Sequence, residues 1–296
     1  MVRDIFPGVN GSGPSNLMVC NYLLYFSAND GTNGNELWVS DGSEAGTLLV
    51  KDIRVGGESS SPSSLVAYGD TLYFSADNGS SGPELWRSNG TELGTFIVTD
   101  INVGAVGSDP RYLTVYNELL YFSAYVEETG DELWVSDGTA GGANLLIDIN
   151  PDVADSSPSY LTVYEDRLYF GAEDGLHGEE LWVTDGSAAG TSRVEDLFVG
   201  AVSSNPYYLT VYDGGLYFRG GNLEDQLYVF DGTAISAVSD FVEGEEISTR
   251  FLFAADYRLY VITASEAYGD ELVVYDGATV EVIDYFAGAD DGLNFD

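Results

Sequence analysis

The 296-residue chain has 49 acidic and 10 basic residues, a formal charge of −39, and is 44% hydrophobic and 13% aromatic. A surface this negative repels nucleic acid and anionic lipid, so both are excluded as partners. No stretch approaches the roughly 18 apolar residues of a membrane helix, and the single cysteine, Cys20, has no partner in the chain for a disulfide.

A unit of 48 residues recurs along the chain. Its clearest mark is Glu-Leu-Trp, which begins at Glu36, Glu84, Glu132 and Glu180, and altered copies follow at Gln226 and Glu271. An aspartate ahead of an apolar residue marks the boundaries, at Asp4, Asp52, Asp100, Asp148, Asp196, Asp240 and Asp284. These marks place six repeats at approximately 5–52, 53–100, 101–148, 149–196, 197–240 and 241–284.

Each repeat contains four strand-like segments. In the fourth repeat they lie at 160–164, 168–172, 180–184 and about 192–197, and all are rich in β-branched or aromatic residues. Turn signals such as Asp185-Gly186 separate them. Four antiparallel strands in each of six repeats of 44 to 48 residues predict an all-β fold, a six-bladed β-propeller that forms a single domain over residues 1–296.

The two ends exceed six repeats. Residues 2–5 copy the fourth strand of a repeat, although the sixth repeat has its own fourth strand near 280–286 and the tail resembles the start of another repeat. Either the N-terminal strand pairs with the last blade to close the ring, or the chain is cut from a longer array. No signal peptide precedes this first piece of repeat, so we expect a mature domain or part of a larger protein.

The octapeptide from Glu132 to Thr139, ELWVSDGT, carries a specific resemblance. It resembles the ELWxxDGT repeat family of bacterial secreted and surface proteins. The copy from Glu36 departs at Ser43, and the copy from Glu84 has Asn89 in place of aspartate. The resemblance covers the whole chain through its period. It implies an extracellular or cell-surface repeat domain, and it implies no reaction.

Carboxylates in two loops are candidate calcium ligands. The Asp-Gly turn after the third strand, as at Asp41, is expected to be a cap bonded to local N–H groups, with calcium as the alternative. The loop between the second and third strands is the better metal candidate, because acids lie there beside flexible glycines. The predicted ligands are Asp30, Glu36, Asp77, Glu84, Asp131, Glu132, Asp174 and Glu180. The alternative is a loop of solvated acids.

Aromatic residues have two expected roles. The four tryptophans of the repeated motif lie in mid-strand, so we expect core packing with an internal partner for each indole N–H. Near the start of the first strand of several repeats stand Tyr112, Tyr160, Tyr208 and Phe251. In a propeller these positions lie near the channel, so the four are candidates for an aromatic rim that binds a glycan or peptide. Packing between blades is the alternative.

The sequence favours a non-catalytic function. His177 is the only histidine and has no serine or cysteine at a recognisable spacing, so the chain is not expected to be an enzyme. The preferred hypothesis is an extracellular, multivalent binding or adhesion module, with calcium as a candidate cofactor and a glycan or a surface protein as the partner. The alternatives are a structural bead of a cell-surface array and a calcium-dependent hydrolase on a propeller scaffold.

Overall fold

A computed structural model describes residues 1–221, 226–238, 248–265, 269–276 and 279–283. Their regular structure is all strand except for one 3₁₀ turn, η1 (Ala188–Gly190). None of the described segments is a helix with the length and apolarity needed to cross a bilayer. Repeated β-branched and aromatic residues, interrupted by Asp-Gly and Glu-Asp turns, explain why strands dominate.

The described residues fall into two compact units, Met1–Ser157 and Pro158–Asp296, and each contains three sheets. In the first unit the strands are β1 (Ser15–Cys20), β2 (Leu23–Asn29), β3 (Asn35–Ser40), β4 (Leu48–Lys51), β5 (Ser63–Tyr68), β6 (Thr71–Asp77), β7 (Pro83–Ser88), β8 (Phe96–Thr99), β9 (Arg111–Tyr116), β10 (Leu119–Val126), β11 (Gly130–Ser136) and β12 (Ala143–Ile147). In the second they are β13 (Ser159–Tyr164), β14 (Arg167–Glu173), β15 (Glu179–Thr184), β16 (Ser192–Arg193), β17 (Tyr207–Tyr212), β18 (Gly215–Gly220), β19 (Gln226–Phe230), β20 (Ile235–Ala237), β21 (Ser248–Ala255), β22 (Arg258–Ser265), β23 (Gly269–Tyr275) and β24 (Val280–Ile283).

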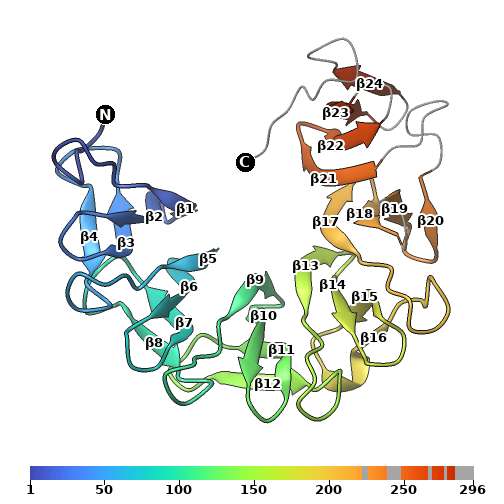
Figure 1. Ribbon diagram of the computed structural model, residues 1–296, viewed down its shortest axis with the longest axis horizontal. Helices are drawn as coiled ribbons and strands as arrows, with labels where there is room; N and C mark the ends of the chain where they lie inside the picture. Colours follow the sequence, from blue (N-terminus) through green and yellow to red (C-terminus); the bar gives the residue numbers. More distant parts are fainter. Residues whose placement is uncertain (222–225, 239–247, 266–268, 277–278, 284–296) are drawn as a thin grey trace. The chain divides into compact units, whose positions relative to one another are not determined.

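Each sheet consists of four strands that are consecutive in the chain and antiparallel to their neighbours (Figure 1). This is the blade of a β-propeller, and the six predicted repeats each contain one such sheet. The prediction of six four-stranded blades is therefore confirmed. Two of the aspartates that mark repeat boundaries, Asp240 and Asp284, lie outside the described residues.

The core of each blade lies in its two middle strands. The leucine of the Glu-Leu-Trp motif is fully buried at Leu37, Leu85, Leu133 and Leu181. Phe74, Phe122, Phe170 and Phe218 on the second strand are equally inaccessible. Within each unit, neighbouring blades contact one another through their first strands, as β1 with β5 and β13 with β17. Both faces of a blade therefore need apolar side chains, which explains why these strands lack a simple alternation of apolar and polar residues.

The fourth strand is shorter than predicted. In the fourth blade it ends at Arg193 rather than near Leu197. The Val194 N–H still bonds to the Leu181 carbonyl oxygen, but the Leu197 N–H turns to the carboxylate of Glu180. A side-chain acceptor thus replaces the strand ladder and ends the pairing.

The N-terminal segment packs on the first blade. Residues 1–14 form no strand, and the described strands of the sixth sheet all lie between Ser248 and Ile283. Instead, Ile5 packs on the cluster of Phe26 and Trp38 in the first blade. The Arg3 guanidinium lies 5.8 Å from the centre of the Trp38 ring. These contacts hold the segment on the first blade.

Candidate functional site

The glutamate of the repeated Glu-Leu-Trp motif is buried in each of the first four blades. Glu36, Glu84, Glu132 and Glu180 are each 0% exposed. Each carboxylate accepts a hydrogen bond from the N–H of the residue after the boundary aspartate, at Ile53, Ile101, Ile149 and Leu197. Each also accepts the hydroxyl of a serine 24 residues further along, at Ser60, Ser108, Ser156 and Ser204. We call each glutamate with its serine a glutamate clasp.

A glutamate clasp ties the third strand of one blade to the segment that leads into the next. The Glu84 carboxylate also accepts the N–H groups of Asn102 and Ser108, both at 3.0 Å. Burial raises the pKa of Glu84 to about 6, although the bonds from Ser108 and Ile101 oppose the shift. Burial likewise raises the pKa of Glu132 and of Glu180 to about 7. These carboxyls therefore serve structure, and they titrate near neutral pH.

The four aspartates of the predicted metal pairs each bond to partners other than the glutamates. Asp30 accepts the N–H groups of Thr32 and Asn33 at 2.8 Å. Asp77 pairs with Arg54, and Asp131 accepts the Ser123 hydroxyl. Asp174 binds the ring of His177 through Nδ1 at 2.8 Å and lies 3.5 Å from Arg193.

No group of three or more acidic, histidine or cysteine side chains is placed to hold a metal in the part of the chain that the structure describes. Asp131 and Glu132 are adjacent in β11, so their side chains leave opposite faces of the sheet. In all four loops the glutamate is committed to its clasp. The structure therefore does not gather the predicted calcium ligands into a site within the described residues.

Salt, rather than calcium, is expected to stabilise the fold. Screening should soften the repulsion within a chain of charge −39, so sodium chloride should raise the melting temperature. Millimolar calcium at equal ionic strength should not raise the melting temperature further. A ligand raises stability only when it binds the folded state more tightly than the unfolded state. Melts in chelator and in calcium at matched ionic strength check this expectation. A rise specific to calcium would contradict it, and Asp174→Asn would then test the fourth of these loops.

The Asp-Gly turns are caps, as predicted. Asp41, Asn89, Asp137, Asp185 and Asp231 each accept the N–H and the hydroxyl of a serine or threonine two residues later. These bonds lower the pKa of Asp231 to about 2. The same geometry with an amide at Asn89 shows that the turn needs an acceptor oxygen and no charge.

The tryptophans pack in the core, as predicted, but their expected polar partner is absent. Trp38, Trp86 and Trp182 are less than 10% exposed. Their indole N–H groups, and that of Trp134, have no hydrogen-bond partner among the described residues. The Lys51 ammonium lies 5.9 Å from the Trp86 ring centre, as Arg3 does over Trp38. Apolar contacts therefore hold the indoles in the core, and a cation also lies over the ring faces of Trp38 and Trp86.

Three of the four predicted ligand-binding aromatics form a row in the second unit. The ring centres of Tyr160 on β13 and Tyr208 on β17 are 5.1 Å apart, and those of Tyr208 and Phe251 on β21 are 4.9 Å apart. The rings are inclined at 56° and 69° to one another, and Phe251 remains 39% exposed. We call these three residues the aromatic row. Tyr112 occupies the equivalent place on β9 in the first unit and is also 39% exposed.

The backbone at the second residue of the first strand adopts an unusual conformation in the first five blades. Five equivalent residues have a left-handed backbone, with φ of 52° at Asn16, 52° at Ser64, 55° at Tyr112, 53° at Tyr160 and 59° at Tyr208. A register shift follows in each strand pair, which is the mark of a β-bulge. A bulky residue at positive φ costs about 1–3 kcal/mol and persists where the surrounding structure imposes it. A strained β-bulge therefore sets the direction of two rings of the aromatic row, those of Tyr160 and Tyr208.

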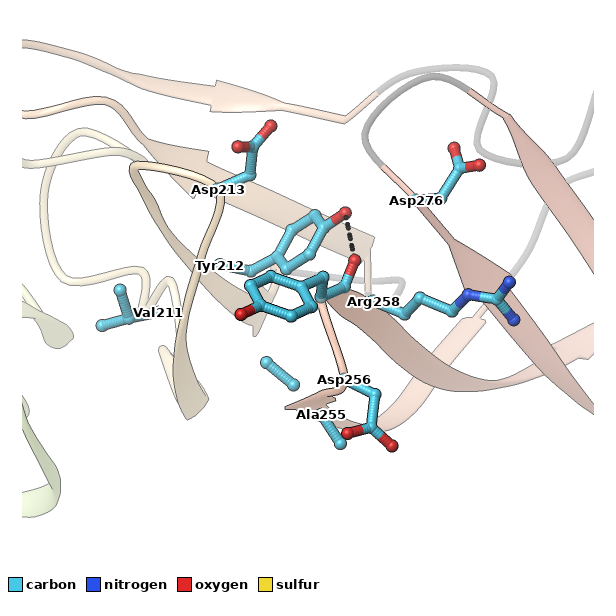
Figure 2. A pocket seen from close by; sticks show the side chains of 9 residues that line it. Val211, Tyr212, Asp213, Ala255, Asp256, Arg258 and Asp276 are labelled. Atoms are coloured by element: carbon cyan, nitrogen blue, oxygen red, sulfur yellow. Dashed lines mark hydrogen bonds between the residues drawn. The ribbon is translucent and has the colours of Figure 1, made fainter.

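A cavity of about 480 Å³ lies at the other end of β17, beside the turn between β21 and β22 (Figure 2). The Tyr212 hydroxyl donates to the Tyr257 carbonyl oxygen at 3.4 Å. Asp213 and Asp276 flank that hydroxyl, while the Arg258 guanidinium extends away from it. Burial first, and then Asp213 and Asp276, raise the pKa of Tyr212. The negative potential of this cavity disfavours anionic ligands.

Catalytic groups are not assembled around His177. Its Nδ1 is bound to Asp174 in the same loop, and no hydrogen bond joins the imidazole to a serine or cysteine within the described residues. The bond to Asp174 explains the position of the ring without any catalytic role. Sequence reasoning missed the glutamate clasps, whose only signal was a serine 24 residues after each glutamate.

Comparison with known proteins places the fold and no family. No protein-family model matches the chain, and no curated protein matches it. Among solved structures it is similar to the β-propeller domain of the Trilobed protease from Pyrococcus furiosus, described as having an open velcro topology (12% identity, TM-score 0.54, covering 92% of this chain and 84% of that one).

Two further likenesses are to parts of larger enzymes. One is a prolyl endopeptidase structure (16% identity, TM-score 0.63, covering 91% of this chain and 41% of that one). The other is a puromycin hydrolase (13% identity, TM-score 0.57, covering 92% and 44%). The chain thus spans less than half the length of these two proteins. At such low identity these likenesses show the fold alone: the chain is a β-propeller of six four-stranded blades.

Proposed function

We propose that this propeller is a non-catalytic binding module that holds a glycan on the aromatic row. The observation that carries the proposal is the partial exposure of a continuous set of rings. Phe251 is 39% exposed although its ring contacts Tyr208, so burial between blades does not consume its surface. Exposed aromatic rings contribute large, rigid contact area to a ligand at a low cost in entropy.

The strained backbone supports the same proposal. Asparagine tolerates a left-handed backbone far better than tyrosine, and Asn16 shows that the first blade uses it at the equivalent position. Tyrosine at Tyr160 and Tyr208 therefore opposes local stability, which favours a role for the ring itself. The ring contacts also contribute to packing between blades, and one role does not exclude the other.

The partner chemistry follows from charge. With a formal charge of −39, the surface disfavours acidic polysaccharides, so the proposed ligand is a neutral glycan. In keeping with the ELWxxDGT resemblance, we place the module outside the cell or on its surface, as part of a larger protein or array. Fractionation of the producing cells tests this location, and a strictly cytoplasmic protein would contradict it.

A matched pair of tyrosine variants tests the glycan proposal. Tyr208→Asn removes a ring of the row and relieves the backbone, so we expect retention on an immobilised neutral polysaccharide to weaken about tenfold. Tyr22→Asn is the control, since Tyr22 has φ of 62°, is 97% exposed and belongs to a turn outside the row. Phe251→Leu keeps an apolar side chain and should weaken retention as well.

Two outcomes would overturn the glycan proposal. One is that the unaltered protein is retained by no polysaccharide in a broad neutral panel. The other is that the Tyr208 and Tyr22 variants lose retention equally. Melting curves of all variants distinguish lost binding from lost folding.

The solved structures favour a second candidate, a propeller that serves a hydrolase. Its support is that the similar chains include a prolyl endopeptidase and a puromycin hydrolase. Because His177 has no nucleophile bonded to it among the described residues, this chain alone is expected to cleave no chromogenic peptide or ester substrate. Turnover that Asp174→Asn or His177→Ala abolishes would reverse the preference between the two candidates.

A further inference from the structure

A second cavity lies in the first unit, and the residues that line it are distant in sequence from the aromatic row. Its volume is about 300 Å³, and its walls include Ser61, Ser63 and Ser75 together with Arg54, Asp77 and Pro83. A volume of about 300 Å³ is at the lower end of the range of small-molecule sites. The cavity is therefore of the size that accommodates one small ring.

One serine on this wall lacks the partner that its equivalents have. In the first blade the Ser27 hydroxyl donates to Asn35 at 2.8 Å, and in the third blade Ser123 donates to Asp131. In the second blade the residue equivalent to Asn35 and Asp131 is Pro83, whose side chain accepts no hydrogen bond. Ser75 is only 2% exposed and lines the cavity, and it has no side-chain acceptor at position 83. A molecule in the cavity can therefore accept the hydrogen bond that Asn35 and Asp131 accept in the other two blades.

The remaining wall chemistry restricts the ligand. Arg54 is paired with Asp77 and with Glu58, and Asp109 on the same wall is paired with Arg111, so each charged group of the wall has an opposite charge beside it. The Ser61 and Ser63 hydroxyls also line the cavity and, like Ser75, can both donate and accept. Hydroxyls beside paired charges suit a ligand that is itself neutral and rich in hydroxyl groups.

We propose that this cavity binds one neutral monosaccharide unit, with Ser75 bonded to a sugar hydroxyl. The proposal is independent of the aromatic row, because the two sites share no residue and lie in different units. Loss of either site would leave the other intact. The Tyr208 variants therefore separate a failure of the proposed function from a failure of this site.

Two substitutions at one site test the proposal by ligand-observed NMR, with methyl glycosides of glucose, galactose, mannose and N-acetylglucosamine as probes. Ser75→Ala should weaken binding about fivefold, the effect of one neutral hydrogen bond. Pro83→Asn should abolish binding, because it supplies the acceptor that Asn35 gives to Ser27 and so engages the Ser75 hydroxyl within the protein. Ser27→Ala is the control, since Ser27 is equivalent in the fold but belongs to another blade.

The outcomes decide the matter in either direction. Weakened binding in the Ser75 variant, lost binding in the Pro83 variant and unchanged binding in the Ser27 variant support the site. Glucosamine and glucuronate serve as charged probes in the same experiment. Binding that persists in the Pro83 variant, or a preference for either charged probe, would overturn the proposal. Absence of binding of every probe at tens of millimolar would show that the cavity takes water only. A melting curve of each variant confirms that the fold is retained.

Discussion

Glu84→Ala should lower the free energy of unfolding by about 3 kcal/mol, since it removes the shared acceptor of several buried donors. The N–H groups of Ile101 and Asn102 and the hydroxyl of Ser108 all point at this carboxylate. Glu84 is 0% exposed, so water cannot take its place without opening the structure. Urea unfolding measures the loss. Hydrogen exchange should show that the amides of Ile101 and Asn102 lose protection first.

The chain contains a matched control for this substitution. Gln226 occupies the same motif position in the fifth blade but is exposed at the start of β19. Gln226→Ala should change the free energy of unfolding by less than about 0.5 kcal/mol. Equal effects of the two substitutions would mean that burial of the glutamate, and hence the clasp, contributes nothing particular to stability.

Stability should fall as pH rises from about 5 to about 8. An unfolded glutamate titrates near 4.5, whereas burial raises the folded pKa of Glu84 to about 6 and that of Glu132 and Glu180 to about 7. Between these values the folded state holds more protons than the unfolded state. The contribution of each group is thus complete below pH 4.5 and is lost as pH rises through the folded pKa. The slope is about 1.4 kcal/mol per pH unit for each titrating group.

The measurement must separate this effect from the net charge. Repulsion within a chain of charge −39 also grows with pH, but salt screens exposed charges far more than buried ones. Melting temperatures from pH 5 to pH 8 in 1 M sodium chloride therefore report mainly the buried carboxyls. Glu132→Gln should reduce the slope whatever its effect on absolute stability. A melting temperature that rises steadily over this interval would refute the assignment.

Below about pH 4 the sign reverses. Hydrogen bonds within the Asp-Gly turns lower the pKa of Asp41, Asp137 and Asp185. Their contribution is present above the unfolded pKa and is lost as pH falls through the lowered one. The protein should therefore be most stable between about pH 4 and 5, where both sets of groups are in their preferred state.

The strands, the caps and the buried indoles were predictable because each follows from local chemistry. A regular 48-residue period, short β-branched and aromatic segments and Asp-Gly turns specify four antiparallel strands per repeat. The cap at Asp41 depends only on residues two positions away. Trp38 is in mid-strand beside the buried Leu37, so its burial follows from its place in the repeat.

The role of Glu36 could not be read in the same way. A carboxylate beside a glycine-rich loop ordinarily faces water, which is why the pattern suggested a metal ligand. Its true partners, Ile53 and Ser60, come from the segment that leads into the next blade, 17 and 24 residues further along the chain. The left-handed backbone of Tyr208 was equally hidden, because tyrosine has no intrinsic preference for it. Contacts between repeats, rather than within them, decide both features.

The glutamate clasps also determine where this chain can be divided. Glu84 belongs to the repeat that ends at Asp100, yet its serine, Ser108, belongs to the next repeat. A fragment cut at Asp100 would retain all strands of its last blade and lose the donor that covers the carboxylate. A cut after Ser108 would keep it. Each of the first four blades thus depends on the segment that leads into its successor, so among them unfolding should spread toward the N-terminus from a lost blade, as in a one-dimensional array with directional nearest-neighbour coupling.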